Sequence, residues 1–98
     1  MAKDLRIGAL LDVYGAFLSE KKRTVTEHYY FDDLSLSEIA ENEGITRQAV
    51  RDIIRRTELQ LEKFENECGY YKKFTLLKSL SSDIQKNSEE IKTLIEEL

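Results

Sequence analysis

Four side chains between residues 47 and 55 can form hydrogen bonds with the edges of nucleic-acid bases. They are Arg47, Gln48, Arg51 and Arg55. An arginine can pair through two hydrogen bonds with guanine, and a glutamine can pair in the same way with adenine. Their spacings of three and four residues place them on one side of a helix. This side of the helix therefore predicts contacts with bases in the major groove of duplex DNA.

Apolar residues in the same segment predict which way these side chains point. Val50, Ile53 and Ile54 recur at helical spacing, so we expect them to pack inward and to turn the arginines outward. Thr46 precedes this helix and can cap its first turn. The free N–H groups of that turn suit a phosphate, so Thr46 joins the candidate nucleic-acid-binding residues.

The preceding residues complete a helix-turn-helix pattern. Ser35 and Glu38 have the spacing of a capping box, which predicts the start of a helix. Ala40 is small enough for a second helix to cross closely, and Gly44 permits the tight turn that follows. We expect the helix-turn-helix to occupy about residues 35–56.

Composition limits how the chain can bind a polyanion. The 98 residues carry a net charge of -4, so overall charge gives no attraction to nucleic acid and any binding depends on local charge. Within residues 35–56 the arginines all lie on the second helix, whereas three glutamates lie on the first. A second basic cluster lies before the second predicted helix of the chain and consists of Lys21, Lys22 and Arg23. It can add phosphate contacts or form a solvated turn.

Residues suited to catalysis or metal binding are scarce. His28 and Cys68 are the single histidine and the single cysteine, and neither has partners at the spacing of a metal site or a catalytic pair. We therefore expect a protein that is not an enzyme and uses no metal or other cofactor. The sequence contains no secretory signal and no stretch of about 18 apolar residues, which predicts a cytoplasmic protein without membrane insertion.

The residues after Gly69 form a second long helical pattern. From Leu77 onward apolar residues alternate at spacings of three and four, with one polar member, which is typical of a dimer seam: Leu77, Leu80, Ile84, Asn87, Ile91, Leu94 and Leu98. This stripe either joins two copies in a homodimer or folds back onto the first helix of its own chain. We expect residues 1–68 to form a helical domain and residues 69–98 to form this C-terminal segment.

The arginines also have a purely structural interpretation. A basic helix flank can be a solvated corner of a bundle, with the arginines paired to Glu58 or Glu62 of the same helix. Both interpretations predict the same fold class, an all-α helix-turn-helix bundle with a long C-terminal helical extension. They differ in whether the guanidinium groups are free to bind a ligand.

The motif resembles two known families. The stretch LSLSEIAENEGITRQAVRDIIRRTELQLEKF is similar to the helix-turn-helix of region 4 in bacterial sigma factors. Residues 10–64 resemble the YlxM family of small bacterial helix-turn-helix proteins more closely, through Tyr14-Gly15-Ala16, Glu20-Lys21-Lys22-Arg23, Tyr29-Tyr30, Glu38-Ile39-Ala40-Glu41 and Arg47-Gln48-Ala49-Val50. One departure is Arg51, because the YlxM family commonly has tyrosine there, whereas sigma region 4 often has arginine.

The resemblance implies a cytoplasmic, all-helical DNA-binding regulatory protein, linked through gene neighbourhood to the signal recognition particle pathway. Two functions follow as expectations. The first is a regulator that binds double-stranded DNA as a homodimer. The second is a modulator that binds the RNA or protein components of the signal recognition particle without recognising duplex DNA.

Overall fold

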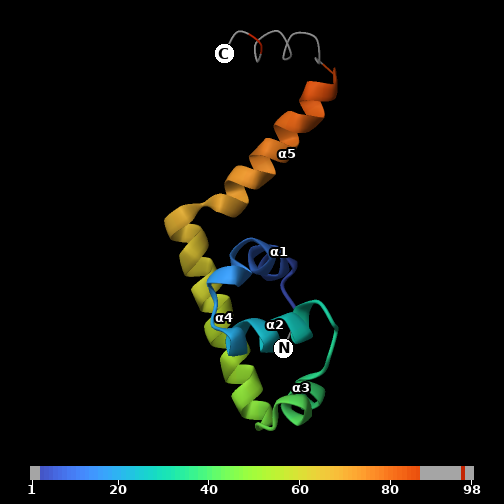
Figure 1. The fold of residues 1–98 in the computed structure, drawn as a ribbon, viewed down its shortest axis with the longest axis vertical. Helices are drawn as coiled ribbons and strands as arrows, with labels where there is room; N and C mark the ends of the chain where they lie inside the picture. The colour runs from blue at the N-terminus through green and yellow to red at the C-terminus, as the bar shows by residue number, and fades with distance from the viewer. Residues whose placement is uncertain (1–2, 87–95, 97–98) are drawn as a thin grey trace.

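The computed structural model describes residues 3–86 and Glu96, and every regular element among them is helical (Figure 1). The elements in chain order are α1 (Leu5–Tyr14), the short 3-10 helix η1 (Gly15–Phe17), α2 (Glu20–Tyr30), α3 (Leu36–Glu43), α4 (Arg47–Cys68) and α5 (Tyr70–Lys86). The predicted fold class, an all-α helix-turn-helix bundle with a long C-terminal helical extension, is confirmed.

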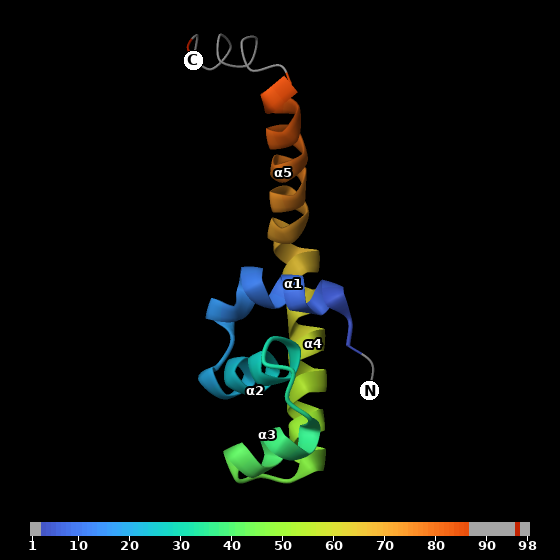
Figure 2. The ribbon, with the colours of Figure 1, turned by 90° about the vertical axis from the view of Figure 1, so that its right-hand side faces the viewer.

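α4 is the element around which the bundle is built. Its 22 residues span about 33 Å at 1.5 Å per residue, and α1, α2 and α3 all pack against it. Figure 2 shows α3 and the start of α4 at one end of the molecule and α5 at the other. The two ends of α4 therefore belong to different parts of the protein.

Two clusters of buried residues hold these helices together. The first joins α1 to the second half of α4 and includes Leu10, Leu11 and Leu61. The second joins α2 and α3 to the first half of α4 and includes Val25, Ile39, Ala40, Val50 and Ile54. The second cluster fixes how α3 and α4 cross, because both helices bury their apolar faces in it.

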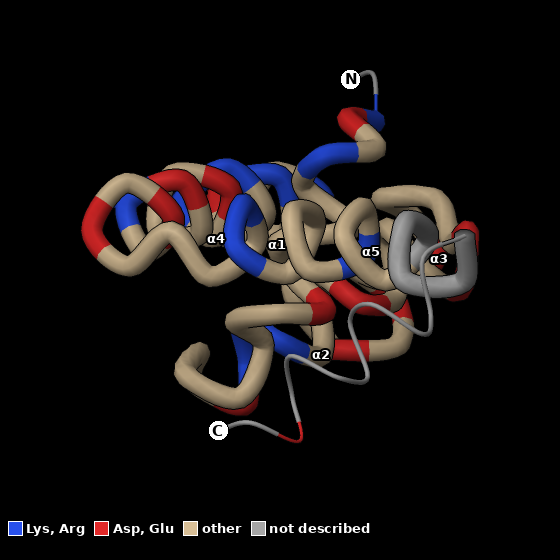
Figure 3. Tube along the Cα trace, turned by 90° about the horizontal axis from the view of Figure 1, so that it is seen from above, with Lys and Arg blue, Asp and Glu red and all other residues tan. Residues whose placement is uncertain are grey.

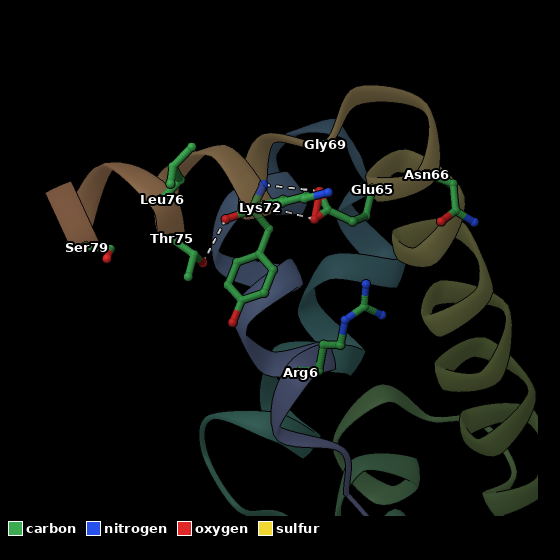
Figure 4. Close-up of a pocket in the computed structure, with 9 residues that line it drawn as sticks. Arg6, Glu65, Asn66, Gly69, Lys72, Thr75, Leu76 and Ser79 are labelled. Carbon is green, nitrogen blue, oxygen red and sulfur yellow. Dashed lines mark hydrogen bonds between the residues drawn. The ribbon is translucent and has the colours of Figure 1, made fainter.

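The corner between α4 and α5 depends on a glycine and a buried carboxylate. Gly69 has φ of 66°, a left-handed conformation that favours glycine, and it ends α4. The Glu65 carboxylate faces the first turn of α5 and accepts hydrogen bonds from the N–H groups of Tyr71, at 3.1 Å, and Lys72, at 3.3 Å (Figure 4). An open groove of about 840 Å³ lies beside this corner, lined by residues of α1, α4 and α5 that include Arg6 and Thr75.

Candidate nucleic-acid interface

The turn between α3 and α4 has the predicted geometry. The Ser35 hydroxyl accepts from the Glu38 N–H at 3.1 Å, and the Glu38 carboxylate accepts from the Ser35 N–H at 3.1 Å, which completes the capping box. Gly44 has φ of 66° and ψ of 33°, so the chain leaves α3 in the left-handed conformation. The Ile45 N–H then donates to the Ala40 carbonyl at 3.1 Å, which closes the turn.

Burial along α4 orients the candidate side chains as expected. Val50 and Ile54 are fully buried, and Ile53 packs partly buried against the same cluster. Arg47, Gln48, Arg51 and Arg55 are all exposed. The apolar anchors therefore turn this group of four side chains outward, at the end of the molecule away from α5 (Figure 2).

The guanidinium groups of this face have no acidic partner. Among the residues that the structure describes, no ion pair involves Arg47, Arg51 or Arg55. The two acids that the structural interpretation assigned to them are engaged elsewhere. The Glu58 carboxylate accepts a hydrogen bond from the Tyr30 hydroxyl at 2.5 Å, and Glu62 forms an ion pair with Arg6. The structure thus leaves the arginine face available to a ligand.

Tyr30 joins α2 to α4 next to the arginine face, through its hydrogen bond to Glu58. Burial raises the pKa of its phenol above the ordinary value of 10.0, and the hydrogen bond to the Glu58 carboxylate raises it further. The phenol therefore keeps its proton and continues to donate to Glu58 at neutral pH. This contact ties α2 to the middle of α4 and helps to hold α4 in place.

A shallow groove of about 360 Å³ lies at the start of α4. Arg47, Gln48 and Arg51 line it together with Leu36 from the start of α3. Leu36 was not among the residues predicted to bind nucleic acid. The Gln48 amide nitrogen donates to the Asp52 carboxylate at 3.0 Å, which holds the amide over the outer face. The spacing of four residues was a signal from which this contact could have been predicted.

Thr46 is the N-terminal cap of α4. Its hydroxyl oxygen accepts from the Ala49 N–H at 3.0 Å, so one N–H of the first turn is satisfied by the cap. Thr46 itself is exposed. The cap starts α4 immediately before Arg47 and so positions the arginine face with respect to the turn.

Comparison with known proteins identifies the family of this chain. The whole chain, residues 1–98, matches the family described as "UPF0122: Putative helix-turn-helix protein, YlxM / p13 like". The chain belongs to the UPF0122 family. This confirms the resemblance to YlxM proteins that the sequence motifs indicated.

Similar UPF0122 proteins occur in several bacilli. A UPF0122 protein of Shouchella clausii is 45% identical over 84 residues, which cover 86% of this chain and 77% of the relative. One from Halalkalibacterium halodurans is 43% identical over 102 residues, covering 98% and 94%. One from Bacillus velezensis is 41% identical over 105 residues, covering 100% and 94%. The family description supports a nucleic-acid-binding protein rather than an enzyme.

The second basic cluster of this UPF0122 chain differs from the arginine face. Lys21 forms an ion pair with Glu43 at 3.3 Å, Lys22 donates to the Gln60 side chain at 3.0 Å, and Arg23 pairs with Glu27 at 2.8 Å. Each cation of the cluster thus has a partner within the protein. Its role in phosphate contacts stays a prediction, and the function proposed below rests on the arginine face of α4.

The predicted dimer seam lies partly within the described residues. Leu77 and Leu80 are on α5 and are 59% and 49% exposed, so they are not buried against the rest of the UPF0122 chain. Ile84 also belongs to α5. Four members of the seam lie outside the described residues: Asn87, Ile91, Leu94 and Leu98.

Of the described helices, none combines the length and the apolar character that crossing a membrane requires.

Proposed function

We propose that this chain is a DNA-binding regulatory protein that inserts the start of α4 into the major groove of duplex DNA. One observation carries this proposal: Arg47, Arg51 and Arg55 project from a helix whose opposite side is fixed in the core, and no described acid neutralises them. Guanidinium groups in this position suit the edges of guanine bases and the phosphates beside them.

The protein acts in the cytoplasm as a homodimer, with residues 1–68 as the DNA-binding domain and residues 69–98 as the segment that joins the two copies. Support comes from the exposed Leu77 and Leu80 and from the apolar spacing that continues after them in the sequence. A homodimer presents two arginine faces, and therefore contacts two half-sites separated by whole helical turns of DNA.

The test is a salt titration of binding to a mixed-sequence duplex, measured by fluorescence anisotropy. We expect Arg51→Ala to weaken binding and to reduce the slope of log affinity against log salt by about 1 for each bound copy, because each copy loses one phosphate contact. Arg56→Ala is the matched control, since Arg56 is exposed on the same helix, about 140° around the axis from Arg51. Equal effects of the two substitutions would contradict the proposal.

The same titration separates the alternative, a modulator of the signal recognition particle. Its RNA and its protein subunits are added in place of the duplex, with wild type, Arg47→Ala and Arg51→Ala. Binding to either of these ligands in the absence of duplex binding would replace the DNA-binding proposal with the alternative.

A further inference from the structure

α5 turns one side toward the rest of the protein. Tyr71 packs against the first core cluster, and Thr75 lines the grooves that separate α5 from α1 and from the end of α4. Successive residues of a helix are about 100° apart, so Leu77 lies about 160° around α5 from Thr75. Leu77 lines neither groove and is 59% exposed. Leu77, and Leu80 close to it on the same side of α5, therefore point away from their own bundle.

Several large apolar side chains of α5 are exposed. Its exposed apolar residues, which we call the α5 apolar face, are Tyr70, Phe74, Leu76, Leu77 and Leu80. Leu77 and Leu80 form its outer part, whereas Tyr70 stacks on the Tyr14 ring and Phe74 and Leu76 line the grooves beside the bundle. Exposed apolar side chains that gather on one helix are typical of an interaction site. Tyr70 and Leu77 are seven residues apart and Leu80 follows three residues later, which is the spacing with which one helix packs against another.

The α5 apolar face is surrounded by positive charge. Residues 70–82 include three lysines and no acid: Lys72, Lys73 and Lys78. Blue segments mark the lysines along α5 in Figure 3. Lys73 lies seven residues before Leu80, so it belongs to the same row. Its ammonium group is 5.7 Å from the centre of the Tyr70 ring. A segment that covers this face must therefore be both apolar and acidic.

Residues 83–98 of the same chain have this chemistry. They contain five acids and two lysines, with Ile84, Ile91, Leu94 and Leu98 at spacings of seven, three and four. We propose that residues 83–98 of a second copy bind to the α5 apolar face, with the two segments running in opposite directions. This inference rests on the homodimer proposed above and adds the direction of pairing and the charges that decide it.

The direction follows from the charge along the segment. Pairing in the same direction brings the three lysines of one copy beside those of the other, and places Lys73 next to Lys73, where like charges repel. Pairing in opposite directions places each basic start beside an acidic end. It also sets the dipoles of the paired helices in opposite directions, which is favourable.

Cys68 allows the direction to be measured in the native sequence. It is the single cysteine, it is exposed, and it is the last residue of α4, directly before Gly69 and α5. Spin labels on Cys68 of the full-length chain give the distance between the two copies. With Lys73 beside Glu97 of the second copy, we expect the labels about 50 Å apart, from 1.5 Å per residue. Pairing in the same direction would bring the two labels next to each other.

Charge reversal tests the same contact independently. Lys73→Glu alone and Glu97→Lys alone should each raise the dissociation constant of the dimer about two- to fivefold, and the double variant should restore it. Leu77→Glu should abolish the dimer. Leu59→Glu is the matched control and should not, because Leu59 is equally exposed, at 62%, but lies on α4. Circular dichroism confirms that each variant remains helical, and sedimentation velocity measures its association.

The outcomes separate this inference from the proposals on which it rests. Labels close together in a dimer would overturn pairing in opposite directions and leave the homodimer intact. A chain that stays monomeric at every concentration would overturn both the homodimer and the pairing in opposite directions. The α5 apolar face would then be covered by residues of the same chain or by a different protein. Neither result changes the Arg51 titration, which tests DNA binding separately.

Discussion

The Tyr14 hydroxyl donates a hydrogen bond to the buried Glu65 carboxylate across 2.8 Å, although the two residues are 51 positions apart in the sequence. The same hydroxyl oxygen accepts from the Tyr70 N–H at 3.0 Å. Glu65 in turn accepts from the first turn of α5. A single connected group of hydrogen bonds thus joins α1, α4 and α5 and sets the direction in which α5 leaves the bundle.

Removal of the Tyr14 hydroxyl should destabilise the protein. Tyr14→Phe leaves the buried Glu65 carboxylate without one donor and the Tyr70 N–H without its acceptor, so we expect the free energy of unfolding to fall by about 1 to 3 kcal/mol. Urea denaturation measures this change. Tyr70→Phe is the control and should cost less than about 0.5 kcal/mol, because the Tyr70 side chain is 44% exposed. Equal costs would argue against the hydrogen-bonded group.

Two glycines should respond to alanine in opposite ways. Gly44→Ala meets no atom within 4 Å, but its φ of 66° is strained for alanine, so we expect a loss of about 1 kcal/mol. Gly8 lies within α1, where an added methyl group makes ordinary contacts with Phe31 at 3.9 Å and Tyr30 at 4.0 Å. Gly8→Ala should therefore stabilise the chain by about 0.5 to 1 kcal/mol, through better helix propensity. Thermal unfolding of both variants checks the difference in sign.

Two buried threonines provide a second matched pair. The Thr26 hydroxyl is fully buried and has no hydrogen-bond partner among the described residues, whereas the equally buried Thr57 hydroxyl donates to the Ile53 carbonyl at 2.8 Å. Thr26→Val should raise the free energy of unfolding by about 1 kcal/mol, because it removes an unsatisfied polar group. Thr57→Val should not stabilise the protein, since it removes a hydrogen bond that is formed. A gain from Thr57→Val as large as that from Thr26→Val would count against this account.

Stability should decrease at high pH through Tyr30. Burial and the Glu58 carboxylate raise the pKa of Tyr30 in the folded state above its ordinary value of 10.0. The contribution of Tyr30 to the free energy of unfolding is therefore fully present when the pH is below that ordinary value, and it is lost as the pH rises toward the raised pKa. We expect the free energy of unfolding to fall as the pH rises above about 10, and to fall less in Tyr30→Phe. Urea titrations across this range measure both slopes. Identical slopes in the two proteins would show that Tyr30 does not contribute.

Much of the helix-turn-helix could be predicted because its signals are local. The Ser35 and Glu38 capping box, the left-handed Gly44 and the Thr46 cap are each formed by residues within four positions of one another. The spacing of Val50 and Ile54 likewise defines a buried side of α4 before any partner helix is known. These features depend on backbone geometry and helical periodicity, both of which can be deduced from short stretches of sequence.

The amino-acid sequence by itself therefore determined the two helices of the helix-turn-helix, the caps at which they begin and the side of α4 on which the arginines lie. Only the tertiary structure decided which charges are paired, because Lys21 meets Glu43 and Arg6 meets Glu62 only once the helices have packed. It likewise brought the Tyr14 hydroxyl to the Glu65 carboxylate. It also decided that Leu77 and Leu80 of α5 point away from the bundle, since the corner at Gly69 and the hydrogen bonds to Glu65 set the direction of the helix. Contacts between distant residues depend on how whole helices pack together, and short stretches of sequence do not contain that information.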